Sequence, residues 1–326
     1  MRKEVVLDVL PDNMWDNYIQ AKPKKVSYYA TNLIKRLNLE SIGALTYEHK
    51  GETKDISRFE KKSTWLLSDG NTNAKTAKNF RPTKILYLLP SSQSGVNFCP
   101  MATPGCIWSC LATAGRGVFQ NVREARLDKS KFYIHYEKLF LEKVREDIIR
   151  ATRQTKALGK EVAIRLNGTS DIPFLEMMNK YGLLKGIPKN VKFYDYTKFP
   201  QNAGIRKVGG YDYVVTYSRG EDFYDKATGK FVNNFQNCME ALYDGKLVAV
   251  VFRNKLPKTW FGFKVVDGDS RDDLMIDLAK KAKKNSGIVI GLKAKGRAKK
   301  NDKKTGQFVI DCDDFNDCRI RWKIKV

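Results

Sequence analysis

The sequence predicts an α/β fold: a (β/α) barrel or partial barrel of six to eight mostly parallel strands, with an N-terminal α+β extension. From residue 84 onward, short β-branched apolar runs alternate with amphipathic or loop segments, which is the rhythm of β/α units. Several runs are apolar almost throughout, as are strands buried on both faces of a parallel sheet. With 42% hydrophobic and 11% aromatic residues in 326 positions, the chain can build a large core.

Residues 1–80 show no clean pattern and are expected to form the extension, packed on the barrel. Helices are expected there near Asp12–Gln20 and Tyr28–Leu37, and a strand near Ser63–Ser68. Residues 81–300 are expected to form the barrel-like domain, and residues 301–326 the C-terminal strands. The strands from residue 84 onward are expected at Lys84–Leu89, Val162–Leu166, Val191–Tyr196, Tyr213–Tyr217, Leu247–Phe252, Lys264–Val266, Ile288–Leu292 and Phe308–Cys312.

Crossover helices are expected between these strands. Ile172–Leu184 and Asp272–Asn285 have the required spacing, while the links Phe199–Gly210 and Arg253–Gly262 look short or irregular. The strongest pattern predicts one long helix between the first two strands, capped by Gly159. Its apolar positions are Phe132, Tyr136, Leu139, Phe140, Val144, Ile148 and Ala151.

The chain is strongly basic, with 60 Lys and Arg against 36 Asp and Glu and a formal net charge of +24. The excess is concentrated in Lys293–Lys304, which holds seven positive charges and one negative. A general solubilising coat is one interpretation, but such a local cluster favours phosphates. Nucleic acid, DNA or RNA, or a nucleotide is therefore the expected partner, with Lys293, Lys295, Arg297, Lys299 and Lys300 as candidate contacts.

No membrane partner is expected, because the longest apolar runs are far shorter than the roughly 20 residues that span a bilayer. Acidic residues interrupt the first apolar stretch, so the chain is not expected to be secreted. In a reducing cytoplasm the six cysteines are expected to be thiols, metal ligands or catalytic groups rather than disulfides.

Polar side chains follow the apolar runs within a few residues. Because parallel strands end at one edge of a sheet, these groups are expected to converge on one pocket. Loops after strands are polar in many α/β proteins, which is the alternative interpretation. The candidates are Asn167, Thr169, Asp171, Asp195, Lys198, Ser218, Glu221, Arg253, Asp267, Asp269, Lys293 and Lys295. Among them, Asp171, Asp195, Lys198, Glu221, Asp267 and Asp269 are the candidate acid–base groups.

Three cysteines, Cys99, Cys106 and Cys110, form a C-x6-C-x3-C triplet in the loop after the first buried strand. Soft thiolates gathered so closely suit zinc or an iron–sulfur cluster; the alternative is three thiols packed as small apolar side chains. Three ligands leave one position open, as on the unique iron of a [4Fe–4S] cluster. A structural zinc ion needs a fourth ligand, for which Cys312, Cys318, His49 and His135 are the remote candidates.

Other nucleotide-binding and hydrolytic signatures are absent. The sequence contains no G-x-x-x-x-G-K-[ST], no G-x-G-x-x-G after a strand, no H-E-x-x-H and no G-x-S-x-G. Cys238, Cys312 and Cys318 receive no firm role.

From about residue 65 to residue 298 the sequence resembles the bacteriophage "gene product 88" family. The resemblance is carried by Gly70-Asn-Thr-Asn-Ala-Lys-Thr-Ala-Lys-Asn79, Cys99-Pro-Met-Ala-Thr-Pro-Gly-Cys106, Arg165-Leu-Asn-Gly-Thr-Ser-Asp171, Phe193-Tyr-Asp-Tyr-Thr-Lys198 and Val266-Asp-Gly-Asp269. It implies a phage origin and action in the cytoplasm of an infected bacterium, but no particular reaction.

The chain also resembles radical S-adenosylmethionine enzymes, which carry three cluster cysteines after the first strand of a partial barrel. The cysteine spacing differs from their usual C-x3-C-x2-C, and Asn167-Gly-Thr-Ser-Asp171 stands where a Gly-Gly-Glu motif is expected. This resemblance implies a [4Fe–4S] cluster on Cys99, Cys106 and Cys110, with S-adenosylmethionine on its open iron. Cofactor contacts would then come from strand-end residues, namely Asn167, Thr169, Asp171 and Ser218.

Three functions follow from these features. The first is an iron–sulfur enzyme, of radical type, that modifies nucleic acid or a nucleotide. The second is a barrel transglycosylase or glycosidic-bond enzyme with catalytic aspartates, in which the cysteines are structural or bind zinc. The third is a non-enzymatic protein that binds DNA or RNA through its charge.

Overall fold

The computed structural model describes residues 45–72, 75–225, 229–300 and 304–320. The helices predicted near Asp12–Gln20 and Tyr28–Leu37 lie outside these ranges. The described α-helices are α2 (Pro104–Trp108), α3 (Gln120–His135), α4 (Glu137–Lys156), α5 (Phe174–Lys180), α6 (Asn234–Tyr243) and α7 (Leu274–Ala279). The strands are β1 (Thr46–His49), β2 (Glu52–Asp55), β3 (Leu67–Asp69), β4 (Thr83–Leu86), β5 (Val162–Arg165), β6 (Val191–Thr197), β7 (Gly204–Val208), β8 (Tyr211–Ser218), β9 (Phe223–Asp225), β10 (Lys230–Val232), β11 (Leu247–Phe252), β12 (Thr259–Trp260), β13 (Phe263–Asp267), β14 (Ile288–Lys293), β15 (Val309–Ile310) and β16 (Asp317–Cys318).

The main sheet is large and mostly parallel, as predicted. In the described part of the chain it has 12 strands, in the order β16-β12-β13-β14-β11-β8-β6-β5-β4-β3, with β15 beside β11 and β7 beside β8. All neighbours from β4 to β13 are parallel, whereas β3 and β7 pair antiparallel with β4 and β8. The α/β class is therefore confirmed, with a larger sheet than the six to eight strands expected.

From β4 to β14 the order across the sheet follows the order along the chain, as it does in a (β/α) barrel. Closure is not confirmed: no ladder joins β3 to β16 within the described ranges. The sheet ends on short strands, β3 with three residues and β16 with two, and neither presents a long parallel edge for a partner.

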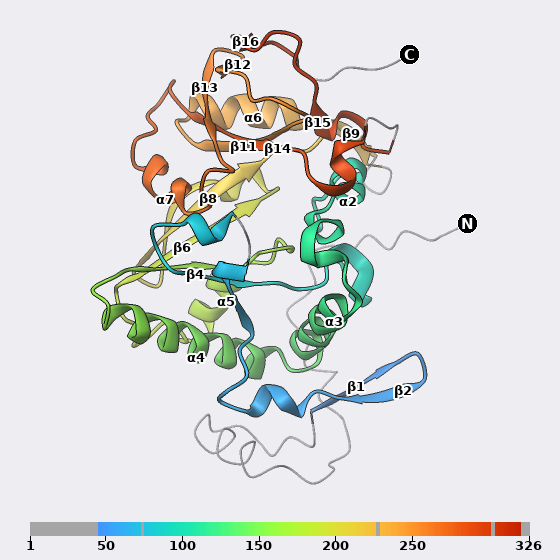
Figure 1. Ribbon diagram of the computed structural model, residues 1–326, viewed down its shortest axis with the longest axis vertical. Helices are drawn as coiled ribbons and strands as arrows, with labels where there is room; N and C mark the ends of the chain where they lie inside the picture. The colour runs from blue at the N-terminus through green and yellow to red at the C-terminus, as the bar shows by residue number, and fades with distance from the viewer. Residues whose placement is uncertain (1–44, 73–74, 226–228, 301–303, 321–326) are drawn as a thin grey trace.

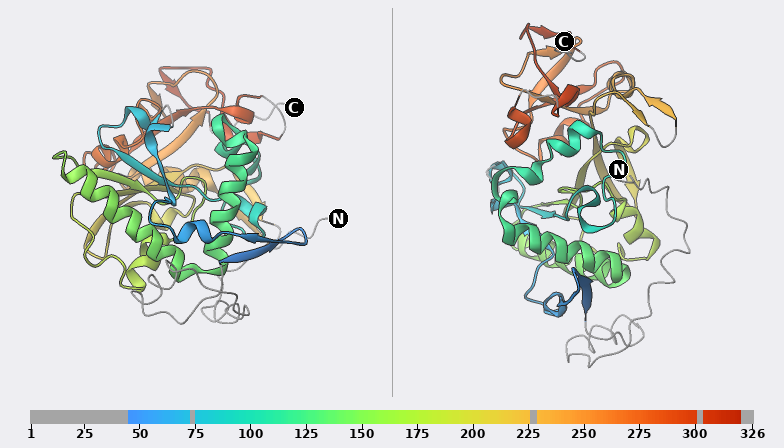
Figure 2. Two further views of the ribbon diagram at one scale, coloured as in Figure 1. Left: turned by 60° about the horizontal axis from the view of Figure 1, so that its bottom comes forward. Right: turned by 90° about the vertical axis from the view of Figure 1, so that its right-hand side faces the viewer.

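The two faces of the sheet are covered differently (Figure 1). Helices α3 to α6 cover one face, where side chains such as Val162, Phe193 and Val215 join the helices in the core. The short helix α7 covers the other face, where Met275 and Ile276 contact Tyr194 and Ala249. The hairpin β1–β2 lies near α3, far from β16, in Figure 1 and in the right-hand view of Figure 2.

The expected long helix is two helices. Tyr136, with φ −141° and ψ 50°, interrupts the helix between α3 and α4. The apolar spacing continues across the break because Phe132 and Phe140 enter the same core, with ring centroids 5.5 Å apart. The pattern therefore identified the buried face correctly and missed the break, which neither Gly nor Pro marks.

Two links also differ from expectation. The segment Phe199–Gly210 contains β7, which pairs antiparallel with β8, and α6, which was not predicted, lies between β8 and β11.

None of the described helices is both long and apolar enough to cross a membrane.

Candidate functional site

The cysteine loop follows β4 at the carboxyl edge of the sheet. The sulfur of Cys99 lies 3.6 Å from the carbonyl oxygen of Thr169, which belongs to the loop after β5. The backbone N–H of Asp171 donates to the carbonyl of Phe98 at 2.8 Å. The loops after the first two parallel strands are therefore held together, and each of the three thiols is half-buried.

The three thiols influence one another electrostatically. Burial raises the pKa of each thiol, that of Cys99 to about 12, and Cys106 and Cys110 add to the rise at Cys99. Lys198 opposes the rise at Cys106 and Cys110, and Arg126 opposes it at Cys110. Within the described ranges, no group of three His, Cys, Asp or Glu side chains is arranged to hold a metal ion as it stands.

Glu221 anchors the helix that carries Cys106. Its carboxylate accepts hydrogen bonds from the hydroxyl of Thr103, the N-cap of α2, and from the backbone N–H of Gly105. A Cβ on Gly105 would lie 2.8 Å from a Glu221 oxygen and 2.7 Å from the carbonyl of Thr305, so glycine permits this close approach. Glu221, a candidate acid–base residue, is thus engaged in holding the cysteine loop.

Asp171 and Lys198 meet beside the thiols. Asp171 accepts hydrogen bonds from the Lys198 backbone N–H at 2.7 Å and from the Thr197 hydroxyl at 2.9 Å. Burial raises the Asp171 pKa to about 6 in spite of these bonds. The ammonium of Lys198 donates to the Ser218 carbonyl and hydroxyl and to the Arg219 carbonyl, at 2.9 to 3.0 Å. The predicted residues Asp171, Lys198 and Ser218 are therefore brought together.

Asn167 and Asp195 form a buried pair that shapes the turn after β5. Asp195 accepts from the backbone N–H groups of Leu166 and Asn167, at 3.2 and 2.8 Å, and from the Tyr213 hydroxyl at 2.8 Å. The Asn167 side chain bonds Ile172 in turn. These contacts orient the turn, and the catalytic role of Asp195 and the cofactor role of Asn167 stay predictions.

The Asp195 carboxyl is expected to make stability depend on pH. Burial raises its pKa to about 7 from an ordinary 3.8, so folding favours the protonated form. Its contribution is full below about 3.8 and is lost as the pH rises through about 7. Relative to Asp195→Asn, the wild type should lose up to about 1.4 kcal/mol of unfolding free energy per pH unit in this window.

Urea unfolding of both proteins from pH 4 to 8 measures this difference. The amide places a donor where Asp195 accepts, which adds a pH-independent cost, so the slopes are compared rather than the absolute values. Parallel pH profiles of the two proteins would contradict the assignment.

A cationic pocket of about 590 Å³ lies at the ends of β11 and β14. Its lining has six cations and one carboxylate: Lys75, Lys78, Arg253, Lys293, Lys295, Lys299 and Asp269, with Asn254 and Ala294. Asp269 accepts from the Lys293 backbone N–H at 2.8 Å and from the Lys295 ammonium at 2.7 Å. The pocket thus brings together four strand-end candidates, Arg253, Asp269, Lys293 and Lys295, with Lys299 of the basic segment. The other strand-end candidates, among them Asp171, Lys198 and Ser218, do not line it, so the expected convergence on one pocket holds only for these four.

The remaining predicted residues lie elsewhere. Arg297 stacks over the Trp108 ring at 4.6 Å, between the basic segment and the cysteine loop. Lys300 is exposed and offers its carbonyl to Arg253. Asp267 is exposed and accepts from the Asp269 backbone N–H, and the Thr169 hydroxyl donates to the Leu88 carbonyl at 2.5 Å. None of these four residues lines the cationic pocket.

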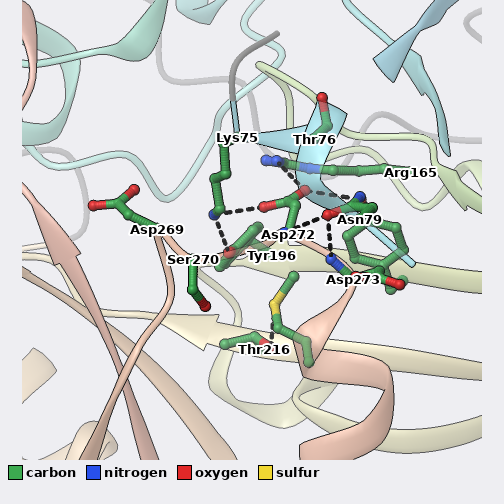
Figure 3. A network of polar contacts seen from close by, with 12 residues as sticks. Lys75, Thr76, Asn79, Arg165, Tyr196, Thr216, Asp269, Ser270, Asp272 and Asp273 are labelled. Atoms are coloured by element: carbon green, nitrogen blue, oxygen red, sulfur yellow. Dashed lines mark hydrogen bonds and ion pairs between the residues drawn. The ribbon is translucent and has the colours of Figure 1, made fainter. Parts of the chain in front are cut away.

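A buried ionic network behind the pocket was not predicted (Figure 3). Asp272, on the loop before α7, pairs with Lys75 at 2.6 Å and with Arg165 at 3.4 Å, and accepts from the Tyr194 hydroxyl at 2.8 Å. Burial alone would raise the Asp272 pKa, but Lys75 and Arg165 hold it well below its ordinary value. Lys75 is therefore a fixed cation in the pocket wall, and its carboxylate partner is almost 200 residues away in the chain.

One cysteine expectation is wrong. Cys312 and Cys318 form a disulfide, so neither can supply the fourth metal ligand as a thiolate. Their Cα atoms are 5.6 Å apart, with Cys312 two residues after β15 and Cys318 at the end of β16. Cys238 is a free thiol on the buried face of α6.

The fold and these groups define an α/β protein whose mostly parallel sheet carries a thiol-rich loop and a cationic pocket at its carboxyl edge. The chain belongs to the Gene product 88 family, which it matches over residues 65–319. Comparisons with curated proteins and with solved structures gave no match. The family expectation is confirmed, and the resemblance to radical S-adenosylmethionine enzymes stays a prediction.

Proposed function

We propose that this protein is an enzyme that modifies a nucleotide or nucleic acid, and that Cys99, Cys106 and Cys110 hold a [4Fe–4S] cluster. One observation carries the proposal. Cys99, Cys106 and Cys110 lie on one loop that contacts with Thr169 and Glu221 hold at the carboxyl edge of the sheet, and the same edge bears the cationic pocket. A redox or Lewis-acidic group would thus lie at the edge that attracts phosphates.

The donor set suits such a cluster in its chemistry. Soft thiolates are the usual cluster ligands, and three of them leave one iron open. Arg126 and Lys198 supply positive charge beside the thiols, and Nη1 of Arg126 is buried without a hydrogen-bond partner. Binding must draw the sulfurs together from their present arrangement and release their protons. Once bound, the cluster would supply single electrons.

The surrounding residues would orient the loop and manage protons. Glu221 and Thr103 fix the start of α2, and Lys198 favours the thiolate forms of Cys106 and Cys110. Asp171, with a pKa near 6, would exchange a proton near neutral pH. S-adenosylmethionine stays a proposal, since Asn167 and Thr169 already use their side chains within the protein.

Asp171 also favours a second candidate function. A half-buried carboxyl with a raised pKa suits acid catalysis of glycosidic-bond exchange, with the thiols structural or bound to zinc. Base chemistry on a duplex would also require the target base to be extruded.

Anaerobic reconstitution with iron and sulfide tests the cluster directly. The wild type is expected to bind about four irons and four sulfides and to turn brown. Cys99→Ala, Cys106→Ala and Cys110→Ala should each lose most of this iron, because each removes one of three ligands. Cys238→Ala removes a thiol from the buried face of α6, and this variant should keep its iron.

The other outcomes separate the alternatives. A colourless wild type without iron would overturn the cluster. One zinc per chain and no iron would favour the transglycosylase. Salt-sensitive nucleic-acid binding with neither metal, and with unchanged nucleosides after digestion, would favour a non-enzymatic protein.

A further inference from the structure

The cationic pocket has more positive charge than its own carboxylates balance. Three of its lysines, Lys78, Lys293 and Lys299, have no acidic partner in the described part of the chain. The other cations are paired: Lys75 with Asp272, Lys295 with Asp269 and Arg253 with Asp311. Like charges gathered around one cavity repel, so an anion would stabilise this arrangement.

Hydrogen bonds and ion pairs hold the segments that line the cationic pocket in place. Arg253 donates to Asp311 at 2.6 Å and to the carbonyls of Ala298 and Lys300 at 3.1 and 2.8 Å, which fixes the turn that presents Lys299. Asp269 holds the Lys293 backbone at the end of β14. Asp272 holds Lys75 on the opposite side. In Figure 3, Lys75 and Asp269 come from separate segments of the chain, with Asp269 to the left of Lys75. The ammonium groups are therefore supported from three separate segments.

We infer that this pocket binds the phosphate chain of a nucleotide-sized ligand, with at least two adjacent phosphates. Its volume of about 590 Å³ lies within the range of small-molecule sites. Lysine ammonium groups bind phosphate oxygens as point charges, and six cations exceed what a single phosphate needs. Arg297 and Lys300, from the same basic segment, lie outside the pocket lining, so the segment's charge is divided between this pocket and the outer surface.

The pocket is also a neighbour of the cysteine loop. A Cβ on Gly296 would lie 2.8 Å from the Cβ of Ala114, four residues after Cys110. Arg297 and Lys304 both cover the ring of Trp108, which lies between Cys106 and Cys110 in sequence. The turn from Gly296 to Lys299 therefore touches the cysteine loop and also lines the pocket. A bound phosphate chain would direct the rest of its nucleotide along this edge.

This inference rests on the proposed function, because it names the phosphate chain of the substrate, but the binding itself needs no cluster. Calorimetric titration of the full chain with inorganic pyrophosphate tests it at low ionic strength. The double variant Lys293→Ala, Lys299→Ala should bind pyrophosphate about tenfold more weakly. The matched control Lys281→Ala, Lys284→Ala removes two exposed lysines before β14, at the other end of the strand, and should stay within about twofold.

Further ligands and variants in the same titration distinguish the possible outcomes. Adenosine diphosphate should bind at least as tightly as pyrophosphate and compete with it. Three results would overturn the inference: no pyrophosphate binding, equal weakening in both double variants, or binding of an oligonucleotide that lacks terminal phosphates without any binding of pyrophosphate. The cysteine-to-alanine variants should keep pyrophosphate binding. Loss of iron with pyrophosphate binding retained supports the pocket, whereas a wild type that takes up no iron overturns only the cluster. Equal thermal unfolding midpoints confirm that the lysine variants fold.

Discussion

Replacing Asp272 with alanine is expected to lower the free energy of unfolding by about 3–5 kcal/mol. The carboxylate is 1% exposed and lies between Lys75 and Arg165. Removing it leaves Lys75 and Arg165 close together without the carboxylate that they share, and deprives the Tyr194 hydroxyl of its acceptor. A buried charge without its partner costs far more than a lost surface pair.

Urea unfolding followed by tryptophan fluorescence at pH 7 measures the loss. Asp244→Ala is the matched control, because Asp244 pairs with Lys246 at 3.3 Å but is 60% exposed, and should cost less than about 1 kcal/mol. Adding Lys75→Met to Asp272→Ala should recover part of the lost unfolding free energy, because it removes one of the two cations that shared the Asp272 carboxylate. Equal effects of Asp272→Ala and Asp244→Ala would show that the network contributes little.

Replacing Glu221 with alanine should release the cysteine loop from the sheet edge. The start of α2 then loses the acceptor for both the Thr103 hydroxyl and the Gly105 N–H. Alkylation of Cys106 by iodoacetamide should become at least about tenfold faster as the helix opens locally. If the cluster forms, iron affinity should fall by about 10- to 100-fold, as it does when a partner that orients metal ligands is lost.

Glu221→Gln keeps an acceptor oxygen and should recover much of the protection. Glu240→Ala, at an exposed position of α6, should change neither alkylation nor iron affinity. The alkylation rate is informative even without metal. Unchanged Cys106 reactivity in Glu221→Ala would mean that the loop is held by other contacts.

Local patterns predicted the parallel strands well. The expected Leu247–Phe252 coincides with β11, because six consecutive apolar or aromatic residues between polar ends leave few alternatives. Helix α6 was missed. Only a few of its residues, among them Cys238 and Leu242, are buried, and its asparagines resemble loop composition. Short helices whose stability comes from tertiary contacts give a weak signal in sequence.

The expectation that polar residues after parallel strands meet at one edge of the sheet located that edge. It does not say on which face of the sheet each side chain lies. It correctly grouped Asp171 with Lys198, because both follow the ends of neighbouring parallel strands. It does not distinguish Asp195, whose carboxylate meets Tyr213 on the helix-covered side. The Lys75–Asp272 pair could not be predicted, because no local pattern relates residues so far apart in the chain.

The segment that precedes β4 has a consequence for how the chain reaches its folded state. Besides the Lys75 pair, Arg81 binds Asp273 at 3.2 Å and Asp277 at 2.9 Å, so the first and last β/α units are joined by side chains across a separation of more than 190 residues. Contacts of such high order form late. During synthesis these ion pairs can form only after α7 has been made. A protein cut at residue 80 would lack Lys75 and its pair with Asp272. Residues on both sides of the expected boundary at residue 80 are therefore tied to the segment 272–277 by ion pairs, Lys75 before the boundary and Arg81 after it.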